Sequence, residues 1–233
     1  MKFIVTDEVF KKLENVMFGI VIAKGINNKK EYPEIKKILS DNINLIEGKF
    51  QNRNVKGTEE INPYREAFLK LGINPNKFMS SIEAMTTRIA KKKGFPNINS
   101  IVDIANAVSL KYLVPLGAHD LESSNGDIFV RFSNKGDQFI PFGEQEAEVL
   151  EEGELIYSIG KRVKTRRWIW RQSEEGKVTE DSSDIFFPID GFTDKNFDNV
   201  INARNELADL LQRIFNCEIK VGLIDKNKRE IEI

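Results

Sequence analysis

Ile128-Phe129-Val130-Arg131-Phe132 begins a long region of this 233-residue chain in which apolar and polar residues alternate. A period of two is typical of a strand with one buried face. Further apolar runs of this kind occur at residues 155–157, 168–171 and 185–187. Turn signals such as Asn134-Lys135-Gly136-Asp137 separate the runs. The middle of the chain is therefore predicted to be mainly β-structure.

Helical patterns precede and follow this region. Helices are predicted at residues 33–46, 62–71, 80–93, 100–108 and 194–215. These ranges begin at capping residues or carry apolar residues at helical spacing. Shorter apolar runs predict outer strands at residues 3–5, 16–23, 218–224 and 230–233. We therefore predict a single α+β domain, residues 1–233, with a central mixed β-sheet flanked by helices.

The composition is that of an ordinary globular protein. Hydrophobic residues make up 40% of the chain, charged residues 30%, and the formal net charge is −1. Such a chain does not attract polyanions as a whole, so a nucleic-acid site must be a local patch. The N-terminus lacks the apolar segment of a signal peptide, and no apolar run approaches the length that crosses a bilayer. We therefore expect a cytoplasmic protein with no membrane partner.

Cysteine and histidine are nearly absent, with only Cys217 and His119. A structural zinc site needs four ligands, mostly of these two types, so that class is excluded. Cys217 lies in an apolar stretch and is predicted to be a small core residue rather than a nucleophile. The chain also has no phosphate-binding Gly-rich loop, nucleophile elbow or helical histidine pair. Neither a metal nor another cofactor is predicted.

Both tryptophans lie in Arg166-Arg167-Trp168-Ile169-Trp170-Arg171-Gln172. In a strand, Trp168 and Trp170 would share one face, and Arg167 and Arg171 the other. Aromatic planes and guanidinium groups are suited to single-stranded nucleic acid, but the same pattern fits buried tryptophans and solvated arginines. Six glutamates at residues 144–154 are able to neutralise part of the patch. We predict mainly core tryptophans, with Arg167 and Arg171 as binding residues.

Two further stretches have both a structural and a functional interpretation. Glu83 follows Ser80 at the spacing of a capping box, and Arg88 fits a surface charge, but both also suit a site. Pro115-Leu116-Gly117-Ala118-His119-Asp120 is either a connecting turn or a loop that brings backbone close to a ligand. His119 alone fits a hydrogen-bonded structural histidine as well as a base.

The order of these motifs resembles the B3/B4 domain of the phenylalanyl-tRNA synthetase beta subunit, including free-standing relatives of that domain. The resemblance covers about residues 62–192, which form a B3/B4-like core with N-terminal and C-terminal additions. It rests on Ser81-Ile82-Glu83, Arg88, and residues 99–106, 115–121, 126–131 and 166–171.

The resemblance implies an RNA-binding module whose partner is tRNA or the 3′ end of aminoacyl-tRNA. It also implies editing, in which mischarged aminoacyl-tRNA is hydrolysed in trans by a positioned water. The implied substrate or RNA-binding residues are Ser81, Glu83, Arg88, Asn106, Gly117, Ala118, His119, Asp120, Arg167 and Arg171. No catalytic residue is assigned, and the motifs of a complete tRNA ligase are not visible.

Three positions depart from the synthetase pattern. Its loop reads Pro-Leu-His-Ala-Phe-Asp, whereas this chain has Gly117 at the histidine position and His119 at the phenylalanine position. The glutamate that recognises a phenolic hydroxyl falls near Pro188. Because a site without that partner loses its discrimination, selection of tyrosine is not expected.

Two other functions are compatible with the sequence. One is a non-catalytic binder of a free amino acid or a similar small carboxylate, held by an arginine, which the near-neutral charge favours. The other is a protein-interaction domain.

Overall fold

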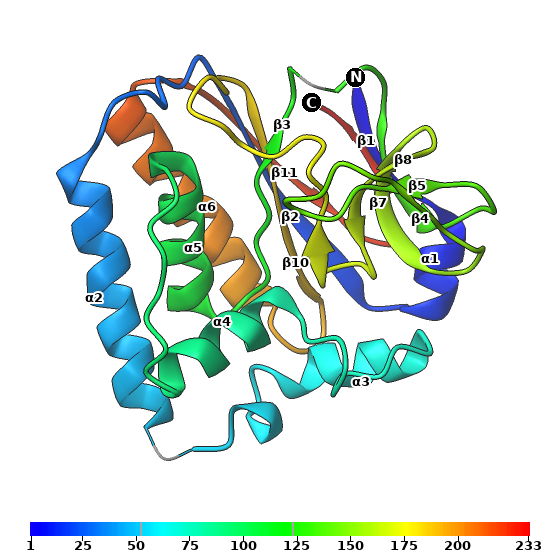
Figure 1. The fold of residues 1–233 in the computed structure, drawn as a ribbon, viewed down its shortest axis with the longest axis horizontal. Coiled ribbons are helices and arrows are strands. Elements are labelled where there is room, and N and C mark those ends of the chain that lie inside the picture. The colour runs from blue at the N-terminus through cyan, green and yellow to red at the C-terminus, as the bar shows by residue number, and fades with distance from the viewer. Residues whose placement is uncertain (52, 123) are drawn as a thin grey trace.

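The computed structural model describes residues 1–51, 53–122 and 124–233. Figure 1 shows α2, α5 and α6 together on one side of the molecule and the β-sheets on the other. The helices are α1 (Asp7–Lys12), α2 (Pro33–Phe50), the short 3₁₀ helix η1 (Val55–Gly57), α3 (Asn62–Lys70), α4 (Ser81–Ala90), α5 (Ser100–Tyr112) and α6 (Phe197–Phe215). None of the helices in the described ranges combines the length and apolar composition needed to cross a bilayer.

The strands form two sheets in the described part of the chain. One has four antiparallel strands in the order β11-β2-β10-β3. The other has eight strands in the order β12-β1-β4-β7-β8-β5-β6, with β9 beside β8. The strands are β1 (Lys2–Val5), β2 (Val16–Lys24), β3 (His119–Asp120), β4 (Ile128–Phe132), β5 (Gln138–Phe139), β6 (Glu148–Val149), β7 (Leu155–Ile159), β8 (Arg162–Arg166), β9 (Arg171–Gln172), β10 (Ile185–Phe192), β11 (Glu218–Ile224) and β12 (Glu230–Glu232).

The predicted α+β class is confirmed, because helices flank sheets that contain both parallel and antiparallel pairs. The pairs β1–β4 and β5–β8 are parallel, whereas β4–β7 and β7–β8 are antiparallel. One central sheet was predicted, and the strands divide between two. Since pairing partners lie far apart in the sequence, local periodicity does not assign a strand to a sheet.

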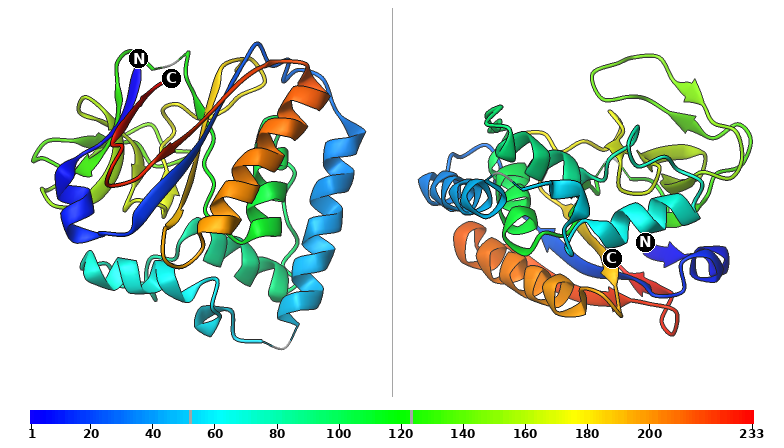
Figure 2. Two further views of the ribbon diagram at one scale, coloured as in Figure 1. Left: turned by 180° about the vertical axis from the view of Figure 1, so that it is seen from behind. Right: turned by 90° about the horizontal axis from the view of Figure 1, so that it is seen from below.

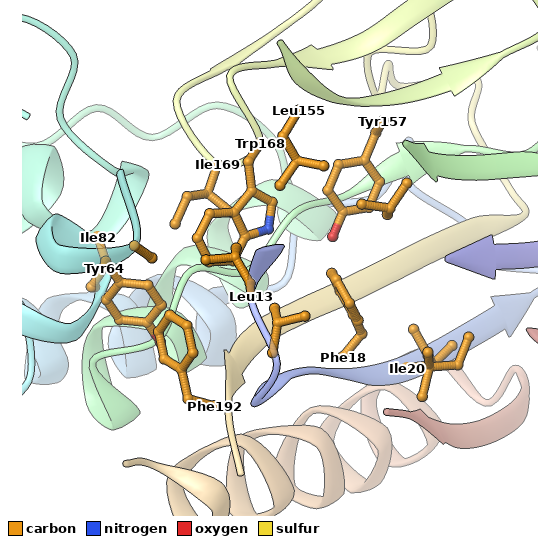
Figure 3. Close-up of a cluster of buried hydrophobic side chains, with 14 of the residues drawn as sticks. Leu13, Phe18, Ile20, Tyr64, Ile82, Leu155, Tyr157, Trp168, Ile169 and Phe192 are labelled. Atoms are coloured by element: carbon orange, nitrogen blue, oxygen red, sulfur yellow. The ribbon is translucent and has the colours of Figure 1, made fainter. Parts of the chain in front are cut away.

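The two middle strands of the four-stranded sheet, β2 and β10, are buried on both faces. Ile185, Phe187 and Ile189 of β10 pack with α5 and α6, and α6 runs along this sheet (Figure 2). Phe186 and Phe192, at alternating positions, face the eight-stranded sheet. Figure 3 shows this second core, in which β2, β10 and the region of β7 contribute side chains from opposite walls. Burial on both faces explains why β2 and β10 read as nearly continuous apolar runs.

Residues 167–170 form the turn between β8 and β9, so the predicted strand at 168–171 is wrong. Arg167 and Trp168 have φ angles of 49° and 60°, in the left-handed region. A side chain there does not alternate between faces, so the expected separation of tryptophans from arginines does not hold. Trp168 is nevertheless 0% exposed, which confirms that it belongs to the core.

Two glycine variants test the packing of these layers. Gly191→Ala is expected to lower the free energy of unfolding by about 1–3 kcal/mol, because of overpacking. Its Cβ would stand 2.3 Å from Cγ2 of Val200 on α6. Gly48→Ala in α2 meets nothing within 4 Å. Gly48→Ala is expected to raise the free energy of unfolding by about 0.5–1 kcal/mol, because alanine has the higher helix propensity. Urea unfolding of both variants checks these opposite signs, and changes of the same sign would contradict them.

Candidate functional site

A pocket of about 90 Å³ opens where the segment after α5 meets the turn between β8 and β9. Residues 115–117 and His119 form one wall and residues 168–172 the opposite wall, while β10 and β7 close the inner end. The pocket brings together four of the predicted residues, which are Ser81, Gly117, His119 and Arg171. These residues come from separate regions of the sequence, so the fold assembles a common site from them.

Asp190 lies at the inner end of the pocket and is the only charged residue of β10. Its side chain is 3% exposed. Oδ1 accepts hydrogen bonds from the Tyr157 hydroxyl (2.7 Å) and from Nε1 of Trp168 (2.6 Å). Figure 3 shows the Tyr157 oxygen and the Trp168 nitrogen on facing sides of their rings. Within the described residues Oδ2 has no hydrogen-bond donor, so it is available to a ligand in the pocket.

Burial determines the protonation of this carboxyl group. It raises the pKa of Asp190 from 3.8 to about 7, and the hydrogen bonds from Tyr157 and Trp168 oppose the rise. Burial and the neighbouring carboxyl raise the pKa of Tyr157 well above its ordinary value, so its hydroxyl remains a donor. The inner end of the pocket therefore holds a group that changes charge near neutral pH.

The segment from Pro115 to Gly117 is held against β10 by backbone hydrogen bonds. Gly117 N donates to the Pro188 carbonyl (2.9 Å), and Asp190 N donates to the Pro115 carbonyl (3.0 Å). A Cβ at Gly117 would stand 3.1 Å from Nε2 of His119 and 3.4 Å from Cγ of Pro188. The three positions that depart from the synthetase pattern are thus neighbours, and a larger side chain at 117 would displace the His119 ring.

His119 is a buried, neutral histidine. It is 5% exposed, and its ring stacks on Tyr157 with centroids 6.0 Å apart and an interplanar angle of 19°. Burial, with a smaller contribution from the charge of Lys164, lowers the pKa of His119 to about 3. At neutral pH its ring is therefore uncharged.

The turn that carries Trp168 is held in a strained conformation by tertiary contacts. Non-glycine residues at positive φ cost about 1–3 kcal/mol each, and such strain is found most often at functional sites. Here Trp168 N donates to the Leu155 carbonyl (2.6 Å), while the Ile169 carbonyl accepts from Ser81 N (2.8 Å). These contacts fix the wall of the pocket to β7 and to the start of α4.

The two arginines predicted to bind have different surroundings. The Arg167 guanidinium lies 4.0 Å from the centroid of Phe78 and 4.8 Å from that of Trp170, and it contacts Glu154 at 3.4 Å. Arg171 is exposed and forms no ion pair with any residue in the described ranges. The glutamates at residues 144–154 therefore neutralise part of the charge on Arg167, as expected, through Glu154. They leave Arg171 free for an anionic ligand.

Other predicted residues lie outside the pocket lining. Glu83 is fully buried and pairs with Arg65 (2.6 Å). Of the predicted capping box, Ser80 Oγ accepts from Glu83 N (3.3 Å), but the carboxylate binds Arg65 instead of the helix end. Burial raises the pKa of Glu83, and Arg65 opposes this.

Four more of the predicted site residues lie outside the pocket lining, and three of them make hydrogen bonds within the protein. Arg88 is exposed and its Nε donates to the Gly94 carbonyl (2.8 Å), while Asn106 is half-buried on α5. The Ala118 carbonyl accepts from Gln172 Nε2 (2.8 Å), and Asp120 accepts from Ser182 Oγ (2.6 Å). The last two contacts tie the strand that carries His119 to the opposite wall and to the loop before β10.

Asp190 and Tyr157 line the pocket but were not predicted from the sequence. The feature that could have indicated Asp190 is a lone carboxylate in the apolar run Ile185-Phe186-Phe187-Pro188-Ile189-Asp190-Gly191-Phe192. A buried charge in such a run requires partners, but its partners lie 33 and 22 residues away along the chain. In the described ranges no three His, Cys, Asp or Glu side chains converge in a way that would hold a metal ion.

Comparison with known proteins relates most of the chain to one family. Residues 63–216 match the B3/4 domain. The phenylalanine–tRNA ligase beta subunit of Fusobacterium nucleatum is 27% identical over 185 residues, which cover 79% of this chain and 22% of that subunit. The corresponding subunit of Colwellia psychrerythraea is 29% identical over 133 residues, covering 57% of this chain and 16% of the subunit. The chain therefore spans less than a quarter of these relatives.

A solved structure has a similar fold. It is an N-terminal fragment of the phenylalanyl-tRNA synthetase beta subunit from Pyrococcus horikoshii, with a TM-score of 0.52. The similarity covers 93% of this chain and 49% of that fragment, at 11% sequence identity. At this identity the likeness concerns the fold alone.

Proposed function

Because this chain belongs to the B3/4 domain family, we propose that it binds the 3′ end of tRNA or aminoacyl-tRNA in the Asp190 pocket. The observation that carries the proposal is the order of charges along the pocket. A buried carboxyl group lies at the inner end, and the unpaired Arg171 lies at the rim. An aminoacyl end carries hydrogen-bond donors on its amino acid and phosphate groups on its nucleotides, so its own order of charges is complementary.

The rim is also suited to nucleotides. Phe78 and Trp170 form an edge-to-face pair with centroids 4.8 Å apart, and the Arg171 guanidinium lies 6.0 Å from the Trp170 ring. Lys77 adds a second cation over Phe78, at 5.2 Å. Aromatic rings beside cations bind single-stranded ends through stacking and phosphate contacts. This surface is a local basic patch, as a chain of near-neutral charge requires.

We further propose that the pocket hydrolyses mischarged aminoacyl-tRNA in trans. The residues that line it include no cysteine and no lysine, and in this proposal the nucleophile is a bound water. The water oxygen bonds to the ester carbonyl carbon, the bond to the ribose oxygen breaks, and the water's proton passes to that oxygen. Positioning and oriented donors are sufficient to accelerate such a step. The Pro188 side chain offers no hydrogen bond to a phenol, so selection of tyrosine through this position is not expected.

Binding of tRNA at low salt tests the proposal. Arg171→Ala is expected to weaken binding and to reduce the slope of log K against log salt by about one, because one phosphate contact is lost. Arg213→Ala on α6, an exposed arginine paired with Glu34, is the matched control and should leave both quantities unchanged. Undetectable tRNA binding by the unmodified protein would contradict the proposal. Ester loss from a panel of mischarged tRNAs, measured against a no-protein sample, tests the hydrolytic step separately.

A second candidate is a non-catalytic binder of a free amino acid. The small size of the pocket favours it, because 90 Å³ suits a small molecule without its nucleotide. The carboxylate of the amino acid would bind Arg171, and its hydrogen-bond donor group would bind Asp190. A rise in melting temperature with one amino acid, together with no tRNA binding, would select this function.

A further inference from the structure

Two buried nitrogen atoms near the pocket have no hydrogen-bond partner among the described residues. They are Nδ1 of His119 and Nζ of Lys164. The two residues are 5% and 3% exposed. A buried polar group without a partner costs about 1–3 kcal/mol, and an ionised group costs more. Two buried nitrogens without partners lower the stability of the fold. Packing alone therefore does not explain why they are there.

The fold brings the end of Lys164 to the strand that carries His119. Lys164 is the extra residue at the register shift between β7 and β8, where Tyr157 pairs with Thr165 and Ser158 with Val163. Its Nζ lies 2.9 Å from the position that a Cβ would take at Gly176. The Gly176 carbonyl in turn accepts a hydrogen bond from the backbone N–H of Asp120 (3.1 Å), the residue after His119. Lys164 itself does not line the pocket.

The two ring nitrogens of His119 have different surroundings. Nδ1 is buried and without a partner. Nε2 lies on the side of Gly117, 3.1 Å from the position of a Cβ there, and both residues line the pocket. The stacking on Tyr157 fixes the plane of the ring. One nitrogen is therefore directed into the protein and the other toward a ligand.

We propose that burial and the Lys164 ammonium together hold His119 in the neutral form with its hydrogen on Nε2, so that His119 presents a hydrogen-bond donor to the pocket. An ammonium group is a donor without acceptor capacity. In the proposed arrangement the ammonium acts on the Nδ1 side of the ring, where it favours a lone pair and disfavours an N–H. A neutral imidazole has one hydrogen, which then occupies Nε2. Lys164 acts through His119 and is a positioning residue.

A neutral histidine donor selects a ligand with an acceptor atom. Such a group polarises a carbonyl oxygen without donating its proton. In an aminoacyl ester the acceptor is the ester carbonyl oxygen, while Asp190 Oδ2 remains for a donor on the same ligand. This assignment of the ligand rests on the proposed function, whereas the state of the His119 ring does not.

Other charges around the pair act on Lys164. Burial lowers the pKa of Lys164 and the charge of Arg162 adds to this, whereas Glu175 and Asp120 favour the ammonium form. His119 faces the uncharged rings of Tyr157 and Phe186. In the described ranges the charge that acts on His119 is that of Lys164.

Nuclear magnetic resonance of the ligand-free protein tests the proposal, because the chain has a single histidine. The nitrogen shifts should show an unprotonated Nδ1 and a protonated Nε2, without titration from about pH 5 to about pH 8. A hydrogen on Nδ1, or a ring that becomes charged in this range, would overturn the proposal. The unmodified protein thus gives a decisive result even if a variant does not fold.

Lys164 variants test the cause. Lys164→Met should raise the pKa of His119 only in part, because burial, the larger cause of the lowered value, remains. The variant should populate the Nδ1–H tautomer. It should also raise the free energy of unfolding, since an unpaired buried charge is removed. Lys164→Arg keeps a cation and should preserve the tautomer. Lys161→Met, at an exposed lysine of the same hairpin, should change none of these quantities. An unchanged tautomer and pKa in Lys164→Met would refute the role of Lys164, whatever the result for tRNA binding.

Discussion

Asp190→Ala is expected to lower the free energy of unfolding by about 2–4 kcal/mol. The substitution leaves the Tyr157 hydroxyl and the Trp168 indole N–H buried without an acceptor, and each such group costs about 1–3 kcal/mol. Part of this loss is offset, because a costly buried carboxyl group disappears. The net effect remains large, since Trp168 holds a turn with two left-handed residues that needs its tertiary contacts.

Two variants separate the lost acceptor from the lost side chain. Asp190→Asn keeps an oxygen that accepts both hydrogen bonds and should cost much less than alanine. Tyr157→Phe removes one of the two donors and should cost about 1 kcal/mol, the value of a single hydrogen bond. Urea unfolding followed by tryptophan fluorescence measures all three variants. If alanine and asparagine are equally destabilising, hydrogen bonding to Asp190 is not the cause.

Local sequence patterns predicted most elements but not their pairing. The runs that became β4, β7 and β10 were recognisable from apolar residues alone. Helix α2 runs on to Phe50, beyond the predicted residue 46, because its later turns pack against the same core. The division into two sheets depends on contacts between distant segments, which periodicity does not contain.

The turn at Trp168 shows how tertiary contacts override a local pattern. Alternating arginines and tryptophans favour a strand, yet Arg167 and Trp168 adopt left-handed angles. The hydrogen bond from Trp168 to Asp190 and the stacking of Arg167 on Phe78 require this geometry. Local propensity is a weak constraint when buried partners of this kind compete with it.

Site residues were predictable where they were contiguous. Gly117 and His119 belong to one short segment whose glycine, proline and histidine indicated a loop near a ligand, and both line the pocket. Asp190 and Tyr157 acquire their role only through each other, across two sheets. A sequence shows each of them as an ordinary strand residue.

The stability of the protein is expected to depend on pH through Asp190. In the unfolded chain this carboxyl group titrates near 3.8, and in the folded protein near 7. Between these values the folded state holds a proton that the unfolded state has released. The stabilisation from this group is therefore fully present below pH 3.8, and it is lost as the pH rises through about 7. At about 1.4 kcal/mol per pKa unit, the loss amounts to about 4 kcal/mol at most.

Comparison with Asp190→Asn isolates this effect, because the other titrating groups are common to both proteins. The free energy of unfolding of the unmodified protein, minus that of the variant, should fall steadily from about pH 4 to about pH 7 and then level off. Parallel pH profiles would show that the carboxyl group is ionised in the folded protein throughout. Above about pH 7 the Asp190 side chain is a carboxylate, and its Oδ2 attracts a cationic donor. At lower pH the side chain is a neutral acid and lacks this attraction. Affinity for a ligand with an ammonium group should therefore rise over the same interval in which stability falls.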